Sequence, residues 1–258
     1  MFKSVKEVIE YREMIKMMIH RDLRGRYKAS VLGFAWTFIN PFLQLLIYSF
    51  VFSIILRSNI EKYYLFLFVA LIPWLGMSGS VMTSSTCIVS HPSLITKIYF
   101  PRRVLPLAAV ATNIINMLLC MIVVLVVCLF GIGLEFRYLW YLIPAVFVEF
   151  ILAFGIGLIV SSLTVYFRDL EHILSIFVLM WQFVTPIMYP LDMVPERFRM
   201  VFLLNPMTPV VTIFRDVLYY KRAPELNSIL AAFAIGIVFV VLGWALFGKL
   251  EKRFAEEL

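Results

Sequence analysis

Six runs of mainly apolar residues occur along the chain, and each approaches the length of a membrane-spanning helix. They cover residues 31–56, 64–86, 104–130, 138–166, 173–189 and 229–247. A helix needs about 20 apolar residues to cross a bilayer. The runs are continuous and do not alternate with polar residues, which favours helices over the strands of a barrel. The pattern therefore predicts an all-α integral membrane protein with six transmembrane helices.

The segment before the first run has an amphipathic pattern. Apolar residues recur at helical spacing within residues 1–30, and lysines and arginines occupy much of the remainder. We expect an amphipathic helix that lies at the cytoplasmic membrane interface. Such a helix either anchors the chain to lipid headgroups or docks to a cytoplasmic partner, and the pattern leaves both functions open.

The connection between the fifth and sixth runs is also unusual. Residues 198–204 and 210–220 are apolar but too short to span, and Pro206 and Pro209 separate them. This arrangement predicts a re-entrant hairpin of two half-helices within residues 195–222. A hairpin at membrane depth must be buried in protein or line an aqueous space, which would connect it to a pathway. The alternative is a pair of helices that lie flat on the outer surface.

Composition and charge support a membrane location and give it an orientation. Hydrophobic residues make up 62% of the 258 residues and charged residues only 15%, too few to cover a water-soluble protein. Of the 23 lysines and arginines, 15 lie in the amino-terminal segment, the second and fourth connections and the tail. The positive-inside rule therefore places both termini in the cytoplasm. We expect residues 1–258 to form a single transmembrane domain.

Motifs for an autonomous enzyme are missing. Gly243, Gly248 and Lys249 match part of a phosphate-binding loop, but Leu250 stands where a serine or threonine would contact magnesium. There is no HExxH, paired-cysteine or serine-elbow pattern, so we expect no catalytic residues, no metal site and no bound cofactor. The three cysteines lie unpaired in apolar runs and are expected to be small packing residues.

Polar and aromatic residues inside the runs are the remaining candidates for function. Glu149 in the fourth run is either part of a proton relay or a structural carboxyl group. Asparagine and glutamine residues in the first and third runs are expected to form hydrogen bonds between helices. Aromatic residues are 16% of the chain and can pack helices, meet lipid or stack against sugars.

Three segments resemble the membrane subunits of type-2 ABC exporters for polysaccharides and polyol phosphates. They are RDLRGRYKASVLGFAWTFINP at residues 21–41, HPSLITKIYFPRRVLP at residues 91–106, and the stretch from FRDLEHILSIFVLMWQFVTPIMYPLDMVP to LNPMTPVVTIFRDVLY, which ends at residue 219. They occur in the expected order and extend, with gaps, over most of the chain.

The resemblance implies a homodimeric permease of the bacterial inner membrane that works with two separate ATP-binding-cassette subunits. ATP and magnesium would bind to those subunits, and the cargo would be a lipid-linked glycan, with O antigen favoured over capsule or teichoic acid. Residues 90–101 would form the cytoplasmic coupling segment, and residues 195–222 the outer hairpin. The coupling residues that it implies are Pro92, Ile95, Ile98, Tyr99 and Phe100. Membrane lipids are further partners, and no nucleic-acid partner is expected.

Two further sets of residues are candidates for the transport of a lipid-linked glycan. We expect a glycan channel between two copies of the chain, formed by the first and fifth helices and lined by Phe38, Phe42, Tyr48, Phe177, Trp181 and Phe183. Arg24, Arg26 and Lys28 lie at the membrane entrance and would attract a lipid pyrophosphate, unless they only set the topology. The competing class is a secondary transporter or channel with Glu149 as an ion site, followed by an intramembrane glycan-processing enzyme.

Overall fold

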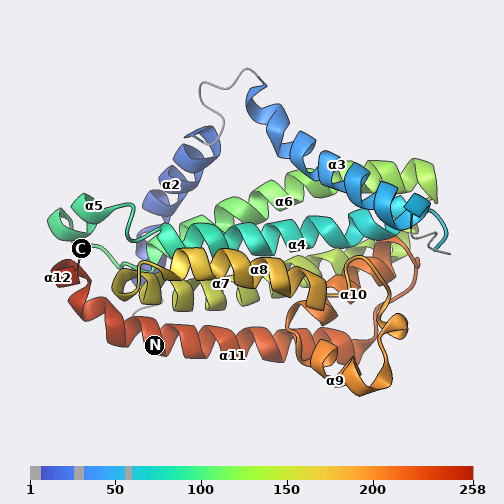
Figure 1. Ribbon diagram of the computed structural model, residues 1–258. Helices are drawn as coiled ribbons and strands as arrows, with labels where there is room; N and C mark the ends of the chain where they lie inside the picture. Colours follow the sequence, from blue (N-terminus) through green and yellow to red (C-terminus); the bar gives the residue numbers. More distant parts are fainter. Residues whose placement is uncertain (1–6, 26–31, 56–59, 258) are drawn as a thin grey trace.

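The computed structural model describes residues 7–25, 32–55 and 60–257, and all regular elements in these ranges are helices. Figure 1 shows a bundle of long helices with α5 and α12 at one end and the α9–α10 hairpin at the other. The main helices are α2 (Arg12–Gly25), α3 (Trp36–Ser49), α4 (Tyr63–Thr86), α5 (Pro92–Lys97), α6 (Val104–Gly131), α7 (Leu142–Tyr166), α8 (Leu170–Val184), α9 (Glu196–Leu204), α10 (Met207–Leu218), α11 (Leu226–Leu250) and α12 (Phe254–Glu257). Short 3₁₀ helices or a π-helix extend or connect some of them, namely η1 (Gly33–Ala35), η2 (Phe50–Ile55), η3 (Phe136–Tyr141), η4 (Leu191–Met193) and η5 (Glu251–Arg253).

Five of the six predicted spans are long and apolar enough to cross a membrane. They are Gly33–Phe52, Tyr63–Thr86, Val104–Gly131, Phe136–Tyr166 and Leu226–Arg253. The prediction of an all-helical membrane protein is confirmed.

The fifth predicted span is shorter than the sequence indicated. Helix α8 ends at Val184, so the predicted continuation to Tyr189 is wrong. Thr185 has an extended backbone, with φ −90° and ψ 132°, because a residue that precedes a proline is disfavoured in the helical region. The 15 residues of α8 extend about 22 Å, which is less than the thickness of the hydrocarbon layer.

The predicted hairpin of two short helices is present. The axes of α9 and α10 meet at 94°. Ten residues of α10 are buried in the end of the bundle, whereas α9 has no buried residue. The two helices therefore do not both lie flat on the surface.

Helix α4 lies at the centre of the bundle. It packs against α3, α6, α7, α8 and α10, and its residues form much of the main hydrophobic core. Helices α7 and α11 form another extensive contact. They approach closely at Gly155, where an added Cβ atom would lie 2.5 Å from the carbonyl carbon of Phe239. Small residues at such positions allow membrane helices to pack backbone against backbone.

A second hydrophobic cluster lies at the end of the bundle that contains α5. It joins α2, the α4–α5 connection, α5, α6, α7, α11 and α12. Within the amphipathic segment, Val8 and Met18 are buried in this cluster, and Ile9 and Met17 are exposed. Helix α2 is therefore docked against the bundle at this end and also presents apolar side chains outward.

Candidate functional site

The predicted coupling residues divide into a buried base and an exposed tip. Pro92 occupies the first turn of α5, where its missing N–H costs nothing. Ile95 and Phe100 are 4% and 5% exposed in the second cluster, whereas Ile98 and Tyr99 are 55% and 93% exposed. Helix α5 ends at Lys97, and the chain is extended at Ile98. The apolar tip available to a partner therefore consists of Ile98 and Tyr99.

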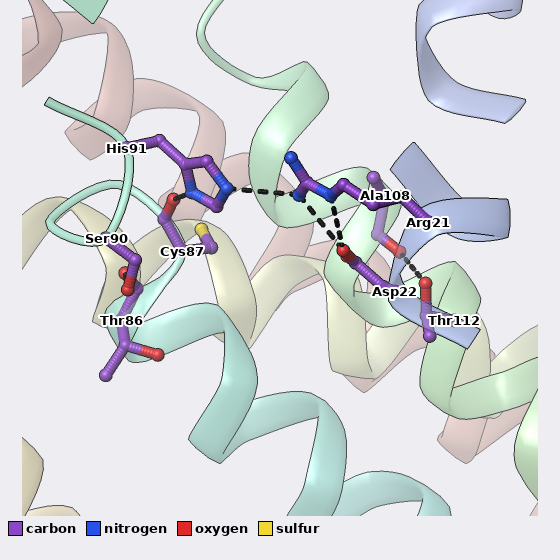
Figure 2. Close-up of polar contacts among 8 residues, drawn as sticks. All are labelled: Arg21, Asp22, Thr86, Cys87, Ser90, His91, Ala108 and Thr112. Atoms are coloured by element: carbon purple, nitrogen blue, oxygen red, sulfur yellow. Dashed lines mark hydrogen bonds and ion pairs between the residues drawn. The ribbon is translucent and has the colours of Figure 1, made fainter. Parts of the chain in front are cut away.

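A histidine connects the coupling segment to the amphipathic helix, as Figure 2 shows. The Nε2 atom of His91 lies 3.0 Å from Nη2 of Arg21, and Nδ1 lies 3.0 Å from the carbonyl oxygen of Cys87. A guanidinium group can only donate, so Nε2 accepts and Nδ1 carries the proton that it donates to Cys87. Arg21 also pairs with Asp22 at 3.0 Å. This contact fixes α2 relative to the start of α5.

A buried arginine connects α6 to the carboxyl-terminal end of α11. Arg103 is 8% exposed, and its Nη2 atom donates a hydrogen bond of 2.9 Å to Oε1 of Glu251. Its guanidinium carbon lies 4.3 Å from the ring centroid of Trp244, within the range of a cation–π contact. The hydroxyl of Tyr166 donates to the carbonyl oxygen of Leu250 at 2.9 Å. These contacts join the start of α6, the end of α7 and the end of α11 beside the coupling segment.

The six predicted channel residues lie on α3 and α8 but differ in exposure. Phe42, Phe177 and Phe183 are 52%, 47% and 53% exposed, and Phe38 and Tyr48 are half-buried. Trp181 is only 8% exposed because its ring packs edge-on against Trp74. Gln182 donates a hydrogen bond of 3.4 Å to the hydroxyl of Tyr48, so the two helices are adjacent. Three of the six rings are thus exposed, one on α3 and two on α8, and their role in a channel stays a prediction.

Several of the intramembrane amides line a cavity instead of joining helices. The cavity has a volume of about 560 Å³ between α3, α4 and α6, and its wall includes Asn40, Gln44 and Asn116. Asn113 behaves as the sequence predicted, because it donates a hydrogen bond of 2.7 Å to Thr83 on α4. The pattern of apolar and polar residues gave no indication that the other amides would share a cavity.

Glu149 is fully buried in α7, and its carboxyl oxygens have no hydrogen-bond partner within the described residues. A proton relay needs a chain of polar or titratable groups, and none forms a hydrogen bond with this carboxyl group in the described part of the protein. Whether Glu149 is part of a relay or a structural carboxyl group stays an open prediction.

The described residues contain no group of three or more side chains that could hold a metal ion. Burial raises the pKa of the Cys87 thiol, so this residue remains a neutral thiol near pH 7. Arg24 is exposed in the last turn of α2. Arg26 and Lys28 lie outside the described residues.

The fold and these features define an integral membrane protein with a docked amphipathic helix, an exposed tip at one end and a hairpin at the other. The chain belongs to the ABC-2 type transporter family, whose model matches residues 13–219. It is 32% identical to the O-antigen export system permease protein RfbA of Myxococcus xanthus, over the full length of both chains. It is 35% identical to the protein of the same name from Klebsiella pneumoniae, over 95% of each chain. The polysialic acid transport protein KpsM of Escherichia coli is 25% identical over 92% of this chain and 93% of its own length.

Proposed function

We propose that the chain is the membrane subunit of an exporter that moves a lipid-linked O antigen outward across the bacterial inner membrane. Support comes from the similarity to two permeases named for O-antigen export, which extends over at least 95% of each chain. The polysialic acid transport protein is less similar, so O antigen is favoured over a capsular polymer. The family match does not favour a secondary transporter with Glu149 as its ion site.

In this proposal a separate ATPase subunit supplies the energy and contacts the exposed tip. The observation that carries this step is the 93% exposure of Tyr99, next to Phe100, which is 5% exposed. An exposed aromatic side chain on a rigid base is suited to act as a buried anchor in an interface. ATP and magnesium would bind to the partner. Closure of two ATPase subunits would then move α5, and through His91 and Arg21 also α2.

The glycan would pass between two copies of the chain, past the aromatic rings of α3 and α8. Aromatic rings can stack against sugar rings without strict direction, so they would let a polymer slide. Both termini and α5 would lie in the cytoplasm, and the hairpin at the opposite end of the bundle would lie near the exit.

The proposal can be tested in proteoliposomes that contain the permease with its ATPase subunit. The wild-type permease alone should hydrolyse no ATP, and the complex should couple hydrolysis to glycan export. Tyr99→Ala should uncouple export from hydrolysis or weaken assembly, because it removes the anchor and leaves the buried base intact. Phe130→Ala is the matched control, since Phe130 is 85% exposed and lies at the far end of α6. Hydrolysis by the permease alone, or full export by Tyr99→Ala, would contradict the proposal.

A further inference from the structure

A second cavity lies at the end of the bundle opposite α5, and the proposed transport pathway does not explain it. It has a volume of about 590 Å³ between the α8–α9 connection, the hairpin and the first turn of α11. This volume falls within the range of about 300–1,000 Å³ that is typical of small-ligand sites. None of the six aromatic residues predicted to line the channel belongs to its wall.

The wall of this cavity contains several charged groups, and their charges balance. It contains three arginines and three carboxylates, namely Arg199, Arg215, Arg222, Asp192, Asp216 and Glu225. Arg222 pairs with Asp216 at 2.7 Å, and Arg199 lies 3.5 Å from Asp192. A phosphate or other anion would be repelled by these carboxylates as well as attracted by the arginines. The balance favours a ligand without net charge that can both donate and accept hydrogen bonds.

The side of the cavity next to the core is held in a fixed position. Arg215 is 4% exposed, and its Nη2 atom donates a hydrogen bond of 2.9 Å to the carbonyl oxygen of Ile187. Its guanidinium carbon lies 3.7 Å from the ring centroid of Phe66. The hydroxyl of Tyr63 donates to the carbonyl oxygen of Met188 at 2.8 Å. A preformed wall reduces the ordering cost of binding.

Two buried wall residues have polar atoms without a partner in the described part of the chain. They are Oγ1 of Thr208, a residue 3% exposed, and Nε of Arg215. Buried polar groups in folded proteins are normally hydrogen-bonded, so unpartnered ones need an explanation. Further donors and acceptors in the wall are Thr212, Asn227 and Ser228. The wall also contains apolar residues, including Pro186, Leu191 and Leu203.

We propose that this cavity binds a neutral sugar ring of the exported glycan. Sugar hydroxyls both donate and accept hydrogen bonds, which matches the mixed arginine, carboxylate and amide groups of the wall. The C–H faces of a pyranose ring match its proline and leucine side chains. The inference rests on the proposed function and adds a saccharide site at the hairpin, separate from the six aromatic residues predicted to line the channel. A sugar held there would oppose backward movement of the polymer.

The site can be tested on the purified full-length permease in lipid nanodiscs, without ATP or the ATPase subunit. Saturation-transfer difference NMR would be recorded with the methyl glycosides of glucose, galactose, mannose and N-acetylglucosamine, and phosphorus NMR with inorganic phosphate. We expect transfer to at least one glycoside. Thr212→Ile should abolish it, because the larger side chain enters the cavity. Thr96→Ile is the matched control, since Thr96 is exposed on α5 at the other end of the bundle.

A second variant with smaller side-chain changes tests the site even if Thr212→Ile does not fold. Asn227→Ala combined with Ser228→Ala removes polar groups from the first turn of α11, and should weaken glycoside binding about two- to tenfold. The proposed site would be refuted if saturation transfer to a glycoside persisted in both variants. It would also be refuted if the wild-type protein showed no transfer to any glycoside. Phosphate binding that Thr212→Ile selectively removes would also overturn it in favour of an anion site. Because the assay measures binding alone, each of these results would leave ATP-driven export to be judged by the Tyr99 experiment.

Discussion

The indole Nε1–H of Trp181 donates a hydrogen bond of 2.7 Å to Oδ1 of Asn205, and this bond joins α8 to the turn of the hairpin. The same oxygen accepts the backbone N–H of Met207 at 3.0 Å. The amide nitrogen of Asn205 donates to Oγ1 of Thr185 at 2.9 Å and to the carbonyl oxygen of Val184 at 3.2 Å. One asparagine therefore connects the end of α8 with both sides of the hairpin turn.

Asn205→Ala should destabilise the protein, because it leaves the buried Trp181 N–H without a partner. An unsatisfied buried group costs about 1–3 kcal/mol, so the thermal midpoint in detergent should fall clearly. Asn227→Ala is the matched control, since Asn227 is exposed. Combining Asn205→Ala with Trp181→Phe should cost less than the sum of the two single changes. An unchanged midpoint for Asn205→Ala would refute this account of the hairpin.

Gly155→Ala should separate α7 from α11. The new methyl group would lie 2.5 Å from backbone atoms of Phe239 and Val240, which no rotamer change can relieve. Overpacking of this kind costs about 1–3 kcal/mol or more, so less folded protein should be recovered from the membrane. Gly25→Ala serves as the control, because a Cβ atom there meets nothing within 4 Å. Equal recovery and thermal stability of the two variants would show that the close approach is unimportant.

His91→Ala should loosen α2 relative to α5, because it removes the acceptor for Arg21. Spin labels at Met17 and Lys97, both exposed, would report the distance between the two helices by electron paramagnetic resonance. We expect a broader distance distribution in the variant. Ser90→Ala is the nearby control, since among the described residues its hydroxyl bonds only to the carbonyl oxygen of Thr86 in the preceding turn. Identical distributions for all three proteins would mean that the histidine contact does not hold the helices together.

The positive-inside rule predicts that Tyr99 is cytoplasmic and Phe136 is external. The test uses single cysteines at these two exposed positions, after replacement of the three native cysteines. A membrane-impermeant maleimide added to intact cells should label the cysteine at 136 and not the one at 99. Permeabilising the membrane should make both cysteines reactive. External labelling at position 99 would reverse the proposed orientation.

Cysteines at Phe42, Phe177 and Phe183 should respond together to a lipid-linked glycan. We expect cross-links between two copies of the chain and lower reactivity when the glycan is present. A cysteine at Ile122 is a control, because Ile122 is 57% exposed on a different helix, α6. If lipid-soluble probes label all three aromatic positions and the glycan protects none, the rings face the bilayer.

The sequence determined the elements because their signals are local. Apolar runs of sufficient length predict membrane helices wherever the backbone must satisfy its own hydrogen bonds. Prolines near residues 186 and 206 stopped helices by local sterics, and so produced the short α8 and the bent hairpin. The wrong end at Tyr189 was an error in the length of the helix, because α8 ends at Val184, two residues before Pro186.

Only the tertiary structure decided which face of each helix is buried. Lipid is as apolar as a protein core, so leucine or phenylalanine in a span carries little information about its neighbours. Thus Ile95 and Phe100 turned inward while Tyr99 turned outward, although all three are apolar or aromatic residues of one short segment. Contacts between distant residues, such as Arg21 with His91, leave no local pattern at all. Their formation depends on how the helices pack, and that is settled by the sum of many small contacts across the whole bundle.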